Sequence, residues 1–249
     1  MAEPRSNPSS LIPSVESKLF LHGHDSARLA VGVLAVGSTV VPGLEEEYRA
    51  YSTLRGRVYL QEQFTTEDKL NPDGSESDSD DRRSVHIGLI ENDRRHNRQR
   101  MIGAMRLIVK QSAEDDPLPI EHHFPVPFDD APAPPLSAEV SRLICEHEDV
   151  AVQSRFKWPL FTAGLAYTSA NTLGPIYGVV TERLRRLLCR VGVPVTALAE
   201  QQYLSEMNST KLPVIVDTAG LQESIKSDTT RARVFSDLQG TLIKDFVYI

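Results

Sequence analysis

The chain has 249 residues, of which 40% are hydrophobic and 24% charged, and its formal net charge is -7 at pH 7. This composition is that of ordinary globular proteins and excludes a wholly disordered or fibrous chain. The acidic balance argues against a nucleic-acid partner, because binding to phosphates requires a basic surface.

The sequence also indicates a compartment. No apolar run reaches the roughly 18 residues of a membrane span, and the first residues lack the basic and apolar segments of a secretory signal. Cys145 and Cys189 lie in apolar runs without the spacing of a metal site, which favours buried thiols in a reducing compartment. We therefore expect a cytoplasmic protein without a membrane span.

The first third of the chain predicts an arm, a strand and a helix. Residues 1–26 are rich in serine and proline without periodicity, which predicts a flexible N-terminal arm before a single domain over residues 27–249. Residues 27–41 are apolar and valine-rich, which indicates a strand that ends at Pro42-Gly43. Apolar side chains then recur at intervals of three and four residues, which predicts a helix over 44–64.

The middle of the chain predicts a hairpin and a further strand. Residues 71–83 are polar and acidic, which is typical of a solvated loop. Apolar runs over 85–90 and 101–109 predict two strands joined by a long polar tip. Seven prolines within 117–135 predict an extended connection to a strand over 138–145.

The last part predicts helices and strands in alternation. Helical patterns lie within 161–173 and over 176–191, and short strands follow over 193–198 and 212–216. An amphipathic helix is predicted over 221–238. The whole order indicates an α/β protein with a mixed sheet in one layered domain.

Two charged clusters belong to the first helix and the acidic loop. Arg55 and Arg57 lie near the end of the helix, where arginines also serve to cover apolar surface with their stems. Asp78, Asp80 and Asp81 precede a strand, and a solvated acidic loop is their default interpretation beside a functional one.

Two further clusters place charge inside predicted strands. Arg106 interrupts an apolar strand, so it requires a carboxylate or an anionic ligand as partner. Glu139 and Arg142 lie in one strand, where strict alternation puts Glu139 with Ser141 and Arg142 on the opposite face. If both serve one site, a β-bulge must redirect one of them, and bulges are frequent beside active sites.

Five motifs in order carry a family resemblance: LRGRVY, the acids before SVH, IGAMRL, EVSRL and TERLRRLLCRVGVPVTAL. Over residues 45–217 this pattern resembles the acyl-homoserine-lactone (autoinducer) synthases and, more closely, the N-acyl amino acid synthases. The resemblance implies the GCN5-related N-acetyltransferase (GNAT) fold, with a mixed, mostly antiparallel, twisted sheet flanked by helices and with splayed central strands.

The resemblance also assigns roles. It implies that Glu139 and Arg142 are catalytic. Asp78 and Asp81 match the family's acid pair, and Asp80 is an alternative member of that pair. The resemblance implies substrate binding by Arg55, Tyr59, Asp78, Asp81, Ser84, Arg106 and Ser141. Phe64 stands where the autoinducer synthases have a tryptophan, and the acidic loop is longer, which departs from the pattern for an S-adenosylmethionine substrate.

The implied reaction moves a medium or long acyl chain from a thioester to the amine of an amino acid or related small molecule. The amine attacks only when neutral, so a carboxylate such as Glu139 is a suitable base. Backbone N–H groups where the strand splays would bind the developing oxyanion. We expect no permanently bound cofactor or metal, and an acyl-phosphopantetheine thioester as co-substrate.

The acyl donor is predicted to be acyl carrier protein rather than coenzyme A. The segment HEDVAVQSRFKWPLFTAG lacks the glycine-rich turn that binds the coenzyme's pyrophosphate in ordinary members of the fold. It offers instead a local basic set that an acidic carrier protein would recognise, although a solvated helix face has the same pattern. This set comprises Arg155, Lys157, Arg183, Arg185, Arg186 and Arg190. The predicted carrier contacts among them are Arg155, Lys157, Arg183 and Arg186.

Two alternatives remain open at this point. An autoinducer synthase would cyclise its product into a lactone. A non-catalytic module of the same fold would hold an acyl carrier or lipid without turnover, but the charged pair Glu139 and Arg142 inside a strand argues against it.

Overall fold

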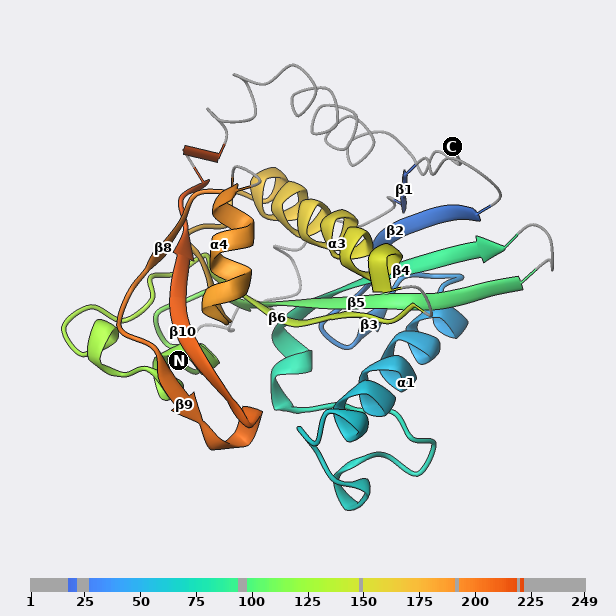
Figure 1. The fold of residues 1–249 in the computed structure, drawn as a ribbon, viewed down its shortest axis with the longest axis horizontal. Coiled ribbons are helices and arrows are strands. Elements are labelled where there is room, and N and C mark those ends of the chain that lie inside the picture. Colours follow the sequence, from blue (N-terminus) through green and yellow to red (C-terminus); the bar gives the residue numbers. More distant parts are fainter. Residues whose placement is uncertain are drawn as a thin grey trace, which may run out of the picture.

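The computed structural model describes residues 18–21, 27–93, 98–147, 150–190, 193–218 and 220–221. Within these ranges ten strands form one mostly antiparallel sheet in the order β1-β2-β4-β5-β6-β7-β10-β8, with β3 paired to β2 and β9 to β10 (Figure 1). The strands are β1 (Lys18–Leu21), β2 (Ala27–Val36), β3 (Thr39–Val40), β4 (Ser84–Asp93), β5 (Arg98–Lys110), β6 (Ser137–Cys145), β7 (Ile176–Val180), β8 (Val195–Ala197), β9 (Gln202–Leu204) and β10 (Ser209–Val216).

Helices cover the sheet and its connections. The α-helices are α1 (Glu45–Gln61), α2 (Pro119–His123), α3 (Val150–Ala170) and α4 (Glu182–Arg190). The 3-10 helices are η2 (Glu67–Lys69), η3 (Ser79–Arg83), η4 (Val126–Phe128) and η5 (Ser205–Met207). Within the described ranges, no helix has the length and apolar character needed to cross a membrane.

The helices α1 and α3 pack on opposite faces of the central strands (Figure 1). Alternate residues of a strand point to opposite faces, so each strand contributes to two clusters. The face toward α3 buries Val85, Ile87, Met105, Leu107, Leu160, Ala163 and Tyr167. The face toward α1 buries Leu34, Tyr51, Leu54, Met101 and Ala104.

The central strands β6 and β7 separate after a short parallel contact. Ala138, Glu139 and Val140 pair with Ile176, Tyr177 and Gly178. Beyond these pairs β6 continues along β5, and β7 pairs with β10 on its other side. This splay confirms the expected GNAT-like fold class, a mixed sheet that is mostly antiparallel and flanked by helices.

Two predicted elements near the C-terminal part are corrected. The stretch 176–191 is not one helix, because residues 176–180 form β7 between β6 and β10 before α4 begins. The hydroxyl of Thr181 accepts a hydrogen bond from the N–H of Leu184 (3.2 Å), which helps to start α4. Helix α3 also begins earlier than predicted, at Val150.

Further differences concern the connections. The proline-rich connection contains α2 and η4, and the segment predicted as an arm contains β1. Most of the helix predicted over 221–238 lies outside the described residues. Cys145 is buried as expected, whereas Cys189 is exposed.

Candidate functional site

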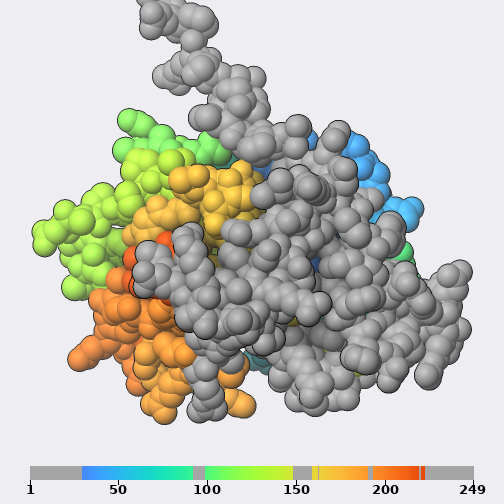
Figure 2. Space-filling view, turned by 90° about the horizontal axis from the view of Figure 1, so that it is seen from above, coloured from blue at the N-terminus to red at the C-terminus, as the bar shows by residue number. Residues whose placement is uncertain are grey.

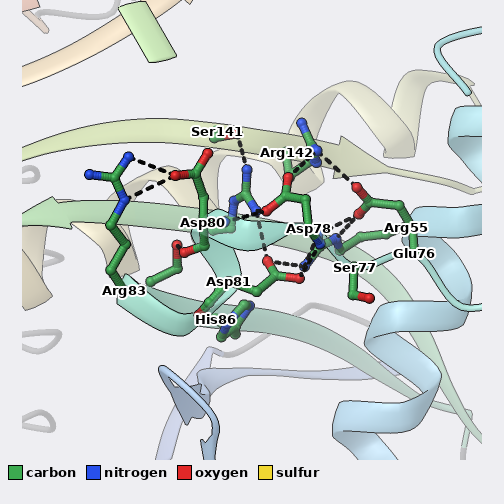
Figure 3. Close-up of polar contacts among 12 residues, drawn as sticks. Arg55, Glu76, Ser77, Asp78, Asp80, Asp81, Arg83, His86, Ser141 and Arg142 are labelled. Atoms are coloured by element: carbon green, nitrogen blue, oxygen red, sulfur yellow. Dashed lines mark hydrogen bonds and ion pairs between the residues drawn. The ribbon is translucent and has the colours of Figure 1, made fainter. Parts of the chain in front are cut away.

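Three arginines from three elements meet the acidic loop between α1 and β4 (Figure 3). Each arginine contacts two carboxylates and each carboxylate contacts two arginines, so the charges alternate around a closed cycle, which we call the ion-pair ring. Its members, in order, are Arg55, Glu76, Arg142, Asp78, Arg106 and Asp81. The structure thus brings together five residues predicted from the sequence and adds Glu76.

Arg55 of α1 and Arg106 of β5 form the buried side of the ion-pair ring. Arg55 donates from Nε to Oε2 of Glu76 (2.7 Å) and from Nη1 to Oδ1 of Asp81 (3.0 Å). Arg106 donates from Nη1 to Oδ1 of Asp78 (2.5 Å) and to Oδ1 of Asp81 (2.7 Å). Both arginine side chains are almost completely buried, at 0% and 1% exposure. Their charges are therefore balanced by the loop rather than by solvent.

A β-bulge brings Arg142 into the ion-pair ring. Its φ of 55° is left-handed, and the register of β6 against β5 shifts at this point. The shift turns Arg142 to the face of Ser141, and its Nη2 donates to Glu76 (2.8 Å) and Asp78 (2.7 Å). The guanidinium also lies over the ring of Tyr59, with 4.6 Å from Cζ to the ring centroid. The bulge that a site shared by Glu139 and Arg142 would require is therefore present.

The acidic loop is held against α1 by close backbone packing. A Cβ on Gly56 would lie 2.1 Å from the carbonyl oxygen of Gly74, so this approach requires glycine. The N–H of Glu76 donates to the carbonyl of Ser52 (3.1 Å). The glycine in LRGRVY therefore permits the loop to dock, and docking buries acids that the sequence alone assigned to solvent.

The arginines lower the pKa values of two ring carboxylates, Asp78 and Asp81. Burial opposes the ionisation of Asp81, but the charges of Arg55 and Arg106 outweigh it and lower its pKa to about 2. Burial also acts on Asp78, where hydrogen bonding and charge from Arg106, together with Arg142, lower the pKa. Asp78 and Asp81 therefore remain charged at neutral pH.

Glu139 lies on the same face of β6 as Ser141, as strand alternation predicts. It is opposite Ile108 of β5 and is 4% exposed. Its Oε2 accepts a hydrogen bond from the N–H of Ile120 in α2 (2.8 Å). Burial raises the pKa of Glu139 to about 7, so the carboxyl group can take up or release a proton near neutral pH.

Two other predicted residues have different surroundings. The hydroxyl of Ser141 accepts a hydrogen bond from Arg106 Nη2 at 3.4 Å, beside the ion-pair ring. The buried hydroxyl of Ser84 donates to the carbonyl of Asp80 (2.6 Å), inside the acidic loop. Ser84 therefore stabilises the end of the loop.

His86 is a neighbour of the ion-pair ring that the sequence did not single out as a site residue. His86 lies on β4, opposite Arg106 of β5, and its Nε2 is 3.2 Å from the carbonyl oxygen of Asp81. Its Nδ1 lies 3.4 Å from the hydroxyl of Tyr51. Burial lowers the pKa of His86 to about 4, so the imidazole is neutral at neutral pH and supports the loop as a hydrogen-bonding group.

The predicted carrier-binding residues lie on α3 and α4. Arg155 and Lys157 are in the first half of α3, and their side chains lie outside the described residues. Arg183 and Arg186 are exposed on α4. Arg186 donates to Glu182 (2.8 Å), so part of the positive charge of α4 is neutralised within the helix. In the part of the chain that the structure describes, no group of three or more His, Cys, Asp or Glu could hold a metal ion.

The sequence matches no family model and no curated protein. The fold is similar to that of BjaI, a CoA-dependent acyl-homoserine lactone synthase solved with SAM and isopentyl-CoA, at a TM-score of 0.57 and 20% identity over 84% of this chain and 90% of that one. It is also similar to FeeM, an N-acyl amino acid synthase from uncultured soil microbes, at 0.56 and 14% identity over 81% and 96%. The AHL synthase LasI gives 0.53 and 14% identity over 77% and 90%. The chain therefore has the fold that acyl-homoserine-lactone synthases share with an N-acyl amino acid synthase.

Proposed function

We propose that this chain is a cytoplasmic N-acyltransferase that moves a medium or long acyl chain from a thioester, preferably on acyl carrier protein, to the amine of an amino acid or related small molecule. The observation that carries the proposal is the buried Glu139. Its pKa is about 7, and it lies in β6 opposite Tyr177 of β7, one residue before the last pair of the β6–β7 ladder. The neighbouring ion-pair ring offers groups of both charges for a substrate.

Glu139 is the proposed general base. An amine must lose a proton before or while it attacks the thioester, and a base with a pKa near the working pH does this most efficiently. A carboxylate with an ordinary pKa would be a weaker base. The raised pKa of Glu139 therefore suits this step, either directly or through one water molecule.

The accessible part of the ion-pair ring is proposed to bind the amino acid. Among its members, the side chains of Arg142 and Asp78 are the most exposed, at 20% and 30%. A substrate carboxylate would pair with Arg142, and the substrate ammonium group with Asp78, in exchange for the present ion pair. The buried arginines would keep the remaining acids in place during this exchange.

The separation of β6 and β7 is proposed to receive the acyl thioester. Val140 and Gly178 form the last pair between these strands, so the backbone beyond them is not engaged in the β6–β7 ladder. N–H groups of this kind can stabilise the oxyanion of the tetrahedral intermediate. Arg183 and Arg186 on α4, with Arg155 and Lys157 on α3, are the proposed contacts for the carrier protein.

The experiment is a product survey with the purified full-length chain. The protein is incubated with acyl carrier protein or coenzyme A bearing one acyl chain, together with each amino acid in turn or with S-adenosylmethionine, and products are identified by mass spectrometry. An N-acyl amino acid supports the proposal. A lactone product would assign the chain to autoinducer synthesis instead. Binding of the acyl donor without any product would identify a non-catalytic module.

A further inference from the structure

The proposed base lies beneath a segment that we call the strap, residues 111–136 between β5 and β6. The strap contains α2, whose Ile120 is completely buried and donates its N–H to Glu139 (2.8 Å). Figures 1 and 2 show this lime-coloured part of the chain beside the orange C-terminal strands, and Gln202 of β9 donates to the carbonyl of His123. The position of the strap therefore determines the surroundings of Glu139.

Arg83 joins the strap to the acidic loop. Its guanidinium donates to Oδ1 of Asp80 from Nε (2.9 Å) and from Nη2 (2.6 Å). The same guanidinium donates to the carbonyl of Pro117 (2.8 Å) and to the carbonyl of Asp116 in the strap. One side chain thus connects the two segments that bear on the proposed site.

Asp80 extends this connection to the ion-pair ring. Its N–H donates to Oδ1 of Asp78 (2.9 Å), an oxygen that also accepts from Arg106. Figure 3 shows the Arg83–Asp80 pair directly beside the ion-pair ring. A continuous series of polar contacts therefore runs from Asp78 through Asp80 and Arg83 to the strap.

We propose that Arg83 and Asp80 act as a positioning clamp. The clamp fixes the strap over Glu139 and so keeps the Glu139 carboxyl group in a fixed position relative to the ion-pair ring. The importance of the clamp for turnover rests on the proposed function, because that function makes Glu139 the base. The clamp contacts themselves do not depend on it.

A comparison with the neighbouring pair Arg82 and Asp116 shows that the Arg83–Asp80 pair is more than a surface ion pair. Arg82 Nη2 lies 3.4 Å from Oδ2 of Asp116, with side chains 69% and 73% exposed. Such pairs contribute little to stability. Arg83 and Asp80 are only 16% and 23% exposed, and Arg83 also binds two backbone carbonyls. Arg82 and Asp116 therefore provide matched controls for the clamp residues.

The clamp also contributes to the charge around Glu139. Burial has the largest effect on Glu139 and raises its pKa, whereas the hydrogen bond from Ile120 and the charge of Arg106 lower it. The Asp80 carboxylate raises the pKa of Glu139 further, and the Arg83 guanidinium lowers it. Asp80→Asn removes the negative charge and loosens the strap, which admits water. Both effects lower the pKa of Glu139. The charges that act on Glu139 are those of Arg106, Asp80 and Arg83. The neighbouring elements also carry Lys110 on β5, Arg142 on β6, Tyr177 on β7, and Glu121, His122 and His123 on α2.

The first test measures hydrogen exchange of the Ile120 amide in the full-length protein. We expect exchange at least about tenfold faster in Arg83→Met than in wild type, because the strap opens more often. Arg82→Met should stay within about twofold of wild type. Equal protection in Arg83→Met and Arg82→Met would overturn the clamp. This measurement needs no turnover, so it tests the clamp even if the proposed function fails.

The second test measures the pH dependence of kcat/KM in the product assay. Asp80→Asn should move the acidic limb to lower pH, whereas Asp116→Asn, which removes a similar but exposed charge, should not. If Arg83→Met does not fold, Asp80→Asn replaces it in the hydrogen-exchange measurement of the Ile120 amide. An unchanged acidic limb in an active Asp80→Asn variant would contradict the electrostatic role. Absence of product from wild type would contradict the proposed function alone.

Discussion

Arg106 and Arg142 bind the two oxygens of one carboxylate, Asp78, at 2.5 and 2.7 Å. They come from neighbouring strands, and regular alternation of β6 would have placed Arg142 on the opposite face of the sheet. The bulge at Arg142 removes this conflict and closes the ion-pair ring. A backbone irregularity is therefore what brings the charged residues together.

Loss of a ring arginine should reduce stability strongly. Arg106→Ala removes the buried arginine that Asp78 and Asp81 share and leaves both part-buried carboxylates with one partner fewer, at a cost of about 3–5 kcal/mol. The variant should also lose activity. The free energy of unfolding is measured with urea. Arg57→Ala is the control, because its pair with Glu146 is exposed and should cost less than about 1 kcal/mol. Equal stability of the two variants would show that the ring arginine is not buried with its acids.

The pH dependence of stability should reveal Asp81. Its folded pKa, about 2, lies below the usual value of a carboxyl group, so its contribution is complete above the unfolded pKa and is lost as pH falls through the folded value. Wild type should therefore lose stability between about pH 4 and pH 2, and Asp81→Asn should show a shallower slope there. Parallel pH curves for the two proteins would contradict ionised Asp81 in the ion-pair ring.

Docking of the acidic loop should depend on Gly56. Gly56→Ala places a Cβ against the carbonyl of Gly74, so the loop must move and the melting temperature should fall by several degrees, corresponding to about 1–3 kcal/mol. Gly178→Ala is the matched control, because its Cβ would meet no atom closer than 3.8 Å. A melting temperature of Gly56→Ala that equals that of the control would exclude the close approach.

Carrier preference should appear in the donor kinetics. Charge reversal at Arg155 and Lys157, or at Arg183, should raise the KM for an acyl chain on carrier protein and leave the KM for the same chain on coenzyme A unchanged. The effect should fade as salt screens the attraction. Equal efficiency with both donors, or rates independent of salt, would contradict a preference for acyl carrier protein.

Much of the sheet and of the candidate site could be predicted from the sequence. Apolar runs of strand length predict the long strands, and Arg106 inside such a strand requires a partner. The pair Glu139 and Arg142 in one strand required a bulge if they share a site, and the bulge is present. Motif order placed Arg55 and Asp81 beside them.

The errors have physical causes in long-range contacts. Residues 71–83 look solvated, because the arginines that neutralise Glu76 are remote in the sequence. One signal in the sequence could have indicated Glu76. The three arginines Arg55, Arg106 and Arg142 lie in apolar segments, and the two acids Asp78 and Asp81 are too few to balance their charges. Residues 176–180 were assigned to a helix because their pattern is apolar throughout, whereas pairing on both sides makes them a strand.

The proposed role of Glu139 as the general base of an acyl transfer is tested by the turnover of Glu139→Gln with the best donor and amine from the product survey. The amide keeps the size of the side chain but cannot accept the proton, so kcat should fall at least about a hundredfold while the melting temperature is retained. In wild type, kcat/KM should fall as pH drops below about 7, because Glu139 becomes protonated. A Glu139→Gln variant that keeps nearly wild-type turnover with the same pH profile would show that Glu139 is not the base.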